Sequence, residues 1–297
     1  MEIAQQKDRV NDLILLARET QREIKEKQAG VGTFFQLTLI RFMNTLEGQL
    51  DKFGSMEGVR EKIGEYEFGI LSEKLEQIDQ IVMRRESGRF VDWATRMSHH
   101  GNQGKDRSEI GYFETLSSQG QFNCLTWKNL PLFKSAFDYA VLPMLMFELR
   151  PATIIELGSG AGASAIWLSD TAQCFNLKTH IYSLDIARPD LQYQHVTYLK
   201  GDCFQIEKSL SSEFLSGLPK PFLVIEDAHA NVLDVLSYLH EFLETGDYFF
   251  IEDSGPKRTV LDEFMSLYGN TYRVDTHYTD LFGKNSVSAY DSIFKRI

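Results

Sequence analysis

The sequence predicts an α/β fold with a doubly wound, mostly parallel sheet of seven strands, preceded by a helical extension. Two observations carry this prediction. A β-branched run at residues 153–155 leads through a glycine-rich turn into the helical composition of residues 164–168, which is the order strand, turn, helix. Further along the chain, short apolar runs alternate with helical patterns at the spacing of βα units.

The N-terminal third has a helical pattern. Apolar residues recur at helical spacing over residues 3–27, 34–50 and 56–83, and glycines separate these stretches. The apolar surface is larger than a helical hairpin can hide, so we expect an extension that covers the second domain or forms a homodimer contact. A self-contained helical extension is the alternative. We expect the extension at residues 1–110, with a polar loop or lid at 98–107, and the second domain at 111–297.

Composition and charge restrict the partners. The 297 residues are 43% hydrophobic and 25% charged, as in globular proteins. The net charge is −11 and no long lysine–arginine cluster occurs, so we expect no nucleic-acid partner. The chain has neither an apolar signal core nor a run long enough to span a bilayer, which predicts a cytoplasmic protein with no membrane partner. Cys124, Cys174 and Cys203 fit reduced thiols better than a disulfide framework.

The spacing of the glycine-rich turn narrows the class of ligand. Gly158, Gly160 and Gly162 stand at alternate positions, whereas the dinucleotide fingerprint has its third glycine one residue later. Glycine allows positive φ and lets a ligand lie against the main chain. Glu156, two residues before the first glycine, suits an amine or a positive charge and does not suit a pyrophosphate. Taken alone, an ordinary βα turn remains the alternative.

Two later predicted strands also end in a carboxylate. Residues 180–185 end at Asp185, about one βα unit after Glu156, and residues 195–202 end at Asp202. In a doubly wound sheet these acids lie at one edge, where Asp185 can accept both hydroxyls of a ribose and Asp202 an adenine amino group. The predicted sheet is therefore Rossmann-like, with a nucleoside site at this edge.

The fourth and fifth predicted strands deliver four more carboxylates to the same edge. Glu226 and Asp227 follow one strand, and Glu252 and Asp253 follow the other. Like charges 4 Å apart repel by about 4 kcal/mol at an effective dielectric of about 20, so the cluster needs positive compensation. A divalent cation is the simplest compensation, and all-oxygen ligands favour Mg²⁺, Ca²⁺ or Mn²⁺. The alternatives are solvated acids at loop ends, or acids that attract a cationic sulfonium ligand.

The glycine-rich turn resembles motif I of the class I S-adenosylmethionine-dependent methyltransferases, a Glu/Asp-x-Gly-x-Gly-x-Gly pattern that it matches in full. This resemblance implies an S-adenosylmethionine pocket. The cofactor-binding candidates are the residues of the turn and the strand-end acids, namely Glu156, Gly158, Ser159, Gly160, Gly162, Ser164, Asp185, Asp202 and Glu226.

A longer part of the chain, about residues 123–296, resembles the cephalosporin hydroxylase and rhamnosyl O-methyltransferase-like family. The matching segments are 127–138, 150–151, the glycine-rich turn, 226–231, 246–248 and 251–254. The family implies oxygen methylation of a secondary metabolite and often a Mg²⁺ site at the ends of the fourth and fifth strands. The ligands implied here are Glu226, Glu252 and Asp253. Glu226 stands where the family commonly has an aspartate, which leaves open whether Glu226 or Asp227 is the ligand.

The chemistry of methyl transfer assigns roles to further residues. Transfer from a sulfonium is an in-line displacement, so the enzyme must align the acceptor oxygen and supply it as an anion or near-anion. Bound Mg²⁺ would lower the pKa of an acceptor hydroxyl. His229 and Lys134 are candidates for the proton acceptor and the charge partner, with a helix-start residue and a solvated lysine as the alternatives. An acceptor carboxylate is already ionised and needs no base.

We therefore predict an S-adenosylmethionine-dependent O-methyltransferase of natural product biosynthesis. Its acceptor is expected to be a hydroxyl or carboxylate of a small or peptide-derived metabolite, with Mg²⁺ assistance. One alternative is a hydroxylase-type tailoring enzyme, which would need an iron site that the sequence does not reveal. The other is a non-catalytic partner subunit, which leaves the intact glycines and acids unexplained.

Overall fold

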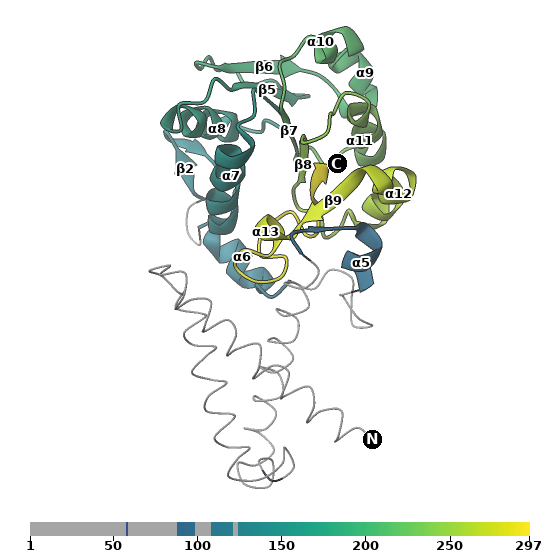
Figure 1. Cartoon of the computed structure of the whole chain (residues 1–297). Helices are drawn as coiled ribbons and strands as arrows, with labels where there is room; N and C mark the ends of the chain where they lie inside the picture. Colours follow the sequence, from purple (N-terminus) through teal and green to yellow (C-terminus); the bar gives the residue numbers. More distant parts are fainter. Residues whose placement is uncertain (1–57, 59–87, 99–107, 121–123) are drawn as a thin grey trace. The chain divides into compact units, whose positions relative to one another are not determined.

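The computed structural model of the chain describes residues 88–98, 108–120 and 124–297, together with Gly58. The chain divides into two units, Met1–Glu86 and Ser87–Ile297, and the description below concerns the second (Figure 1). Apart from Gly58, the three helices expected in the N-terminal third lie outside the described residues, as does most of the polar loop expected at residues 98–107.

An eight-stranded sheet forms the centre of this unit, with the order β1-β9-β10-β8-β7-β4-β5-β6. Its parallel strands are β4 (Thr153–Leu157), β5 (His180–Asp185), β6 (Val196–Lys200), β7 (Phe222–Glu226) and β8 (Tyr248–Ile251). β4 pairs in parallel with β5 on one side and with β7 on the other, so the winding direction reverses beside β4. Ligands of open α/β sheets bind at such a switch point.

The remaining strands form an antiparallel side of the sheet. β10 (Ile293–Arg296) runs antiparallel between β8 and β9 (Tyr272–Asp275), and β1 (Phe90–Val91) pairs antiparallel with β9. The predicted doubly wound, mostly parallel fold is confirmed. β1 adds an eighth strand to the seven expected, because a two-residue strand is too short to show an alternating pattern. A separate hairpin pairs β2 (Thr126–Trp127) with β3 (Leu130–Pro131).

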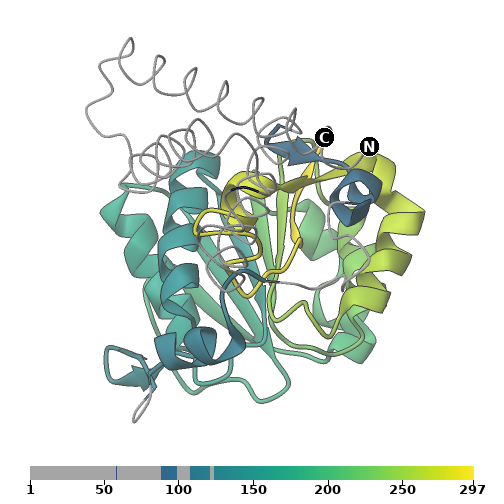
Figure 2. The same cartoon turned by 90° about the horizontal axis from the view of Figure 1, so that it is seen from below.

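Helices cover both faces of the sheet. Figure 2 shows α7 (Ala136–Leu149) and α8 (Ala163–Cys174), in teal, on one side and α11 (Val232–His240) and α12 (Arg258–Tyr268), in green to yellow, on the other. Successive residues of β4 alternate between these layers, since Ile154 joins the apolar core under α7 and α8 whereas Ile155 joins the core under α11 and α12. Burial on both faces explains the continuous apolar runs of the parallel strands.

The start of α7 fixes the position of Lys134. The Ser135 hydroxyl accepts a hydrogen bond from the Asp138 N–H, and the Asp138 carboxylate accepts one from the Ser135 N–H, which is a capping box. The helix therefore begins at Ala136, directly after the cap. Lys134, immediately before the cap, is only 3% exposed and its side chain lies within the fold.

Residues 88–98 are tied into the same unit. Arg96 of α5 (Trp93–Ser98) is fully buried and donates to Asp280 and Asp291, and Arg89 donates to Asp275 of β9. The boundary that we placed at residue 110 stays a prediction. The other short elements are α6 (Tyr112–Ser118), a 3₁₀ turn at Cys203–Gln205, α9 (Ile206–Ser209), α10 (Ser212–Ser216), a 3₁₀ turn at Gly269–Thr271 and α13 (Thr276–Thr279). Within the described part of the chain, no helix combines the length and apolarity that crossing a membrane requires.

Candidate active site

The glycine-rich turn links β4 to α8 at the carboxyl ends of the parallel strands. Gly158, Gly160 and Gly162 all have positive φ, of 98°, 49° and 85°. A Cβ added to Gly158 would lie 2.6 Å from the main-chain oxygen of Asp227, whereas a Cβ on Gly160 would meet nothing within 4 Å. Gly158 therefore lets the turn pass against the loop after β7, and Gly160 presents an open main-chain surface.

Glu156 lies fully buried at the end of β4. Its Oε2 accepts from the Ser183 hydroxyl, which also lies 2.6 Å from the hydroxyl of Ser159. Its Oε1 has no hydrogen-bond partner among the described residues. Burial raises the pKa of Glu156, while Lys134 and the hydroxyls of Ser164 and Ser183 oppose that rise. An interior carboxylate oxygen without a partner is costly, and a bound ammonium group would satisfy it.

Asp185 and Asp202 lie at the ends of the next two strands, as predicted. Asp185 accepts from the main-chain N–H groups of Gly160 at 3.0 Å and Ala187 at 2.8 Å. Asp202 accepts from the N–H of Phe204 at 2.9 Å. These bonds to neighbouring amides orient the two carboxylates, which retain lone pairs for a ligand.

Two apolar side chains flank these acids in the open. Ile186, directly after Asp185, is 68% exposed, and Phe204, two residues after Asp202, is 69% exposed. Large exposed apolar side chains at the carboxyl edge of a sheet offer a surface for a flat ring. We had not singled them out from the sequence, although an apolar residue close behind each strand-end acid was a visible signal.

Buried lysines bind three of the four carboxylates at the ends of β7 and β8. The Lys134 ammonium donates to Glu252 Oε1 at 2.6 Å and to Asp227 Oδ2 at 2.7 Å. The Lys257 ammonium donates to Glu226 Oε2 and to the main-chain oxygen of Glu252, both at 2.5 Å. Glu226 and Glu252 are almost fully buried. Burial works to lower the pKa of Lys134, but Glu252, Asp227 and Glu156 outweigh it and hold that pKa well above its usual value.

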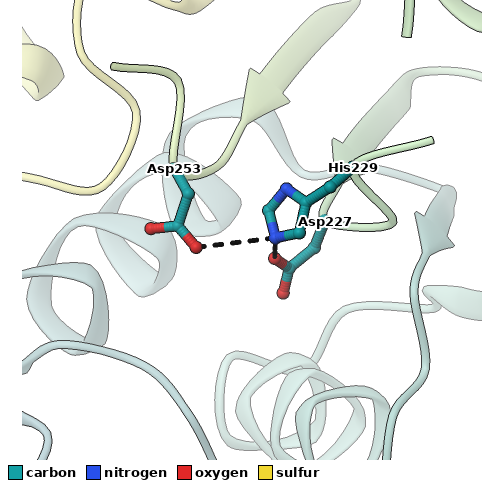
Figure 3. Close-up of side chains that lie close together, drawn as sticks. All are labelled: Asp227, His229 and Asp253. Atoms are coloured by element: carbon teal, nitrogen blue, oxygen red, sulfur yellow. Dashed lines mark ion pairs between the residues drawn. The ribbon is translucent and has the colours of Figure 1, made fainter. Parts of the chain in front are cut away.

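Three other side chains form an open cluster beside these buried pairs (Figure 3). Asp227, His229 and Asp253 each offer one ligand atom, and all three atoms lie within 4.8 Å of one another. His229 Nε2 stands 3.4 Å from Asp227 Oδ1 and 3.6 Å from Asp253 Oδ2. The side chains of His229 and Asp253 are about half exposed or more. Two carboxylates and an imidazole are a donor set that suits a divalent cation.

The loops that carry this cluster hold unusual backbone conformations. His229 and Asn231, after β7, have φ of 55° and 51°, and Asp253, after β8, has φ of 43°. A left-handed conformation costs a non-glycine residue about 1–2 kcal/mol. A hydrogen bond from the His229 N–H to Glu226 Oε1, at 2.9 Å, helps to hold the first of these loops.

The structure thus divides the predicted metal ligands. Asp253 lies in the open cluster, but Glu226 and Glu252 do not, because each is buried and bonded to a lysine. Asp227, the alternative that the sequence left open, takes their place together with His229. The predicted cofactor-binding residues of β4, β5 and β6 lie at one edge of the sheet. Glu226 ends the neighbouring strand β7 and is bound by Lys257. Lys257 belongs to none of the motifs that we recognised, so its role was not predictable from the sequence.

Known relatives match the part of the chain that carries these features. The family model described as Rhamnosyl O-methyltransferase/CmcI matches residues 119–260. A rhamnosyl O-methyltransferase of Mycobacterium leprae is 26% identical over 145 residues, which cover 45% of this chain and 62% of the relative. One of Mycobacterium bovis is 21% identical over 186 residues, covering 54% of this chain and 74% of the relative. The chain therefore spans about three fifths of the length of the first of these relatives.

Two solved structures of CmcI share the fold. An apo structure matches with a TM-score of 0.53 and 23% identity, over 65% of this chain and 87% of the other. A structure described as the Mg-SAM form matches with a TM-score of 0.52 and 24% identity, over the same shares of both chains. Residues 119–260, which contain the glycine-rich turn and both acidic strand ends, are thus similar to the Rhamnosyl O-methyltransferase/CmcI family.

Proposed function

We propose that this protein is an S-adenosylmethionine-dependent O-methyltransferase that methylates a hydroxyl of a small acceptor. The observation that carries the proposal is the buried Glu156 Oε1, which lacks a partner beside an open glycine-rich turn. The methionine part of the cofactor carries an ammonium group of the kind that this oxygen requires. The names of the relatives and the Mg-SAM form of CmcI support the same activity.

The other strand ends fit the nucleoside part of the cofactor. Asp185 would accept the ribose hydroxyls and Asp202 the adenine amino group, as expected for acids at adjacent strand ends. Ile186 and Phe204 would pack against the adenine ring. The open surface at Gly160 would let the cofactor lie against the main chain, since no side chain intervenes.

The open cluster is proposed as the acceptor side of the site. Asp227, His229 and Asp253 would hold a divalent cation, because each offers a ligand atom and these three atoms converge. Glu226 and Glu252 are buried and bound to lysines, whereas Asp227 binds Lys134 through Oδ2 and keeps Oδ1 in the open cluster. A bound cation would lower the pKa of the acceptor hydroxyl and orient it. Without a cation, His229 Nε2 is the group best placed to accept the hydroxyl proton, with Asp227 and Asp253 beside it.

The work of these residues is mainly alignment. The sulfonium carbon is already activated, so the site must bring the acceptor oxygen in line with the breaking bond to sulfur. The close contact between Gly158 and the main chain of Asp227 sets the distance between the glycine-rich turn and the loop after β7.

The substrate class remains that of the prediction, a small natural product or peptide-derived metabolite. The name rhamnosyl O-methyltransferase favours a hydroxyl over a carboxylate. A homodimer through the N-terminal helices and a cytoplasmic location stay predictions.

Calorimetric titration of S-adenosylmethionine into the full chain tests the cofactor. We expect binding in the micromolar range, and loss of about tenfold or more in affinity for Glu156→Gln. Glu213→Gln, an exposed acid of α10, is the matched control and should bind like the wild type. Absence of binding by the wild-type protein well above micromolar concentrations would refute the proposal.

Chelation tests the cation separately. Methyl transfer should fall after EDTA treatment and return when Mg²⁺ or Mn²⁺ is added, while cofactor binding stays unchanged. If turnover is unchanged after EDTA treatment, the proposed role of the cation is refuted, and His229 remains as the proton acceptor.

A further inference from the structure

Lys134 shares a carboxylate with the proposed cation site. Asp227 Oδ2 accepts from the Lys134 ammonium at 2.7 Å, while Asp227 Oδ1 faces His229 Nε2 in the open cluster at 3.4 Å. The Lys134 side chain is buried, and its second partner, Glu252 Oε1, is buried as well. One carboxylate therefore faces an internal ammonium on one side and the proposed metal position on the other.

Repulsion between positive charges opposes the binding of Lys134 and of a divalent cation to Asp227 at the same time. A divalent cation bound to Asp227 would share that carboxylate with the buried Lys134 ammonium, so the two positive charges would repel each other at short range. The ammonium also withdraws part of the negative charge of Asp227 from any metal. We propose that Lys134 is a built-in competitor for the divalent cation, which holds Asp227 when no metal is bound and thereby weakens metal binding. This inference rests on the cation site of the proposed function.

Lys257 provides an internal comparison. It is also a buried lysine at the same strand ends, 8% exposed, and it binds Glu226 and the main-chain oxygen of Glu252. These two hydrogen bonds involve none of the three members of the open cluster. Removing either ammonium changes the charge of the region equally, but only removal of Lys134 releases Asp227.

Mn²⁺ binding to the full chain, measured by electron paramagnetic resonance without cofactor or acceptor, tests the inference. Lys134→Met should bind Mn²⁺ about tenfold or more tightly than the wild type, because one repelling charge is gone and Asp227 is released. Lys257→Met removes the same charge without releasing Asp227, so it should gain clearly less affinity than Lys134→Met. The double variant Lys134→Met/Glu252→Gln keeps the net charge of the wild type, and should still bind Mn²⁺ more tightly.

The double variant also guards against a failure to fold. Neutral side chains of similar size replace both members of a buried ion pair, which proteins tolerate better than the loss of one member. The inference is overturned if Lys134→Met does not gain affinity, if Lys257→Met gains as much, or if the double variant falls below the wild type. Absence of Mn²⁺ binding in all four proteins would overturn both this inference and the cation site. Titration of S-adenosylmethionine into the same samples shows independently whether the methyltransferase proposal stands.

Discussion

The two halves of the sheet edge treat negative charge differently. At the ends of β4, β5 and β6, three carboxylates stand on three separate strands, and each is oriented by a hydroxyl or by amides of neighbouring loops. At the ends of β7 and β8, four carboxylates follow two strands, and two buried lysines, Lys134 and Lys257, bind three of them. We refer to these as the cofactor half and the acceptor half.

The two halves differ in how the negative charge of their carboxylates is compensated. In the cofactor half the chain spaces its acids, and it leaves one oxygen of Glu156 for a ligand to satisfy. In the acceptor half the acids are crowded, so the chain supplies Lys134 and Lys257 and leaves Asp227 and Asp253 accessible. Under the proposed function, the first half would take an organic ammonium and the second an added cation or a proton.

The largest effect is expected where the two halves meet. Gly158→Ala would place a Cβ 2.6 Å from the Asp227 main-chain oxygen, at a φ of 98°. We expect a loss of about 3 kcal/mol or more in unfolding free energy, measured by urea denaturation, because backbone must move. Gly160→Ala is the matched control. It should cost only about 1–2 kcal/mol in stability, since its Cβ meets open space, yet it should weaken cofactor binding. Equal stability losses in the two variants would contradict the role given to Gly158.

The second prediction concerns a substitution that affects the acceptor half alone. Asp253→Asn removes an exposed carboxylate from the open cluster and leaves both lysine pairs intact. Methyl transfer should fall by about 100-fold, since either the cation or His229 loses a partner, whereas the dissociation constant for S-adenosylmethionine should change by less than about twofold. Radiolabelled methyl transfer and calorimetry measure the two quantities. A parallel loss of cofactor affinity would mean that the two halves are not separable.

The third and smallest effect concerns the cofactor half. Glu156→Gln replaces a buried carboxylate by a neutral side chain, so the protein without cofactor should gain about 1 kcal/mol in unfolding free energy. Burial raises the folded-state pKa of Glu156 above its usual value of 4.5. The wild type is therefore penalised while Glu156 is ionised, and the penalty fades as the pH falls through the raised pKa. Denaturation at several pH values should show the gap between variant and wild type narrowing on acidification. A gap that widens would contradict this assignment.

The cofactor half was predictable from sequence because its signals are short-range. Strands buried on both faces appear as continuous apolar runs, and a carboxylate at the end of each run then falls at one edge by the geometry of parallel pairing. The glycine positions follow from the turn itself. This is why the confirmed sheet carries Glu156, Asp185 and Asp202 where the pattern put them.

The acceptor half was only partly predictable. The sequence showed four crowded acids and the need for positive charge, but it did not show which acids the chain itself compensates. Lys134 precedes a helix cap far upstream and Lys257 precedes α12, so their contacts depend on how distant segments pack. The two-residue strand β1 is likewise set by pairing with β9 and not by its own pattern.

The left-handed conformations of His229, Asn231 and Asp253 have a consequence for protein engineering. Glycine would relieve the backbone cost at each of these positions, so a selection for thermal stability alone would favour it there. At His229 and Asp253 the same exchange would delete the side chains that converge in the open cluster. In a variant library, glycine at these two positions should therefore raise the melting temperature and lower the turnover, as expected where stability and activity trade against each other.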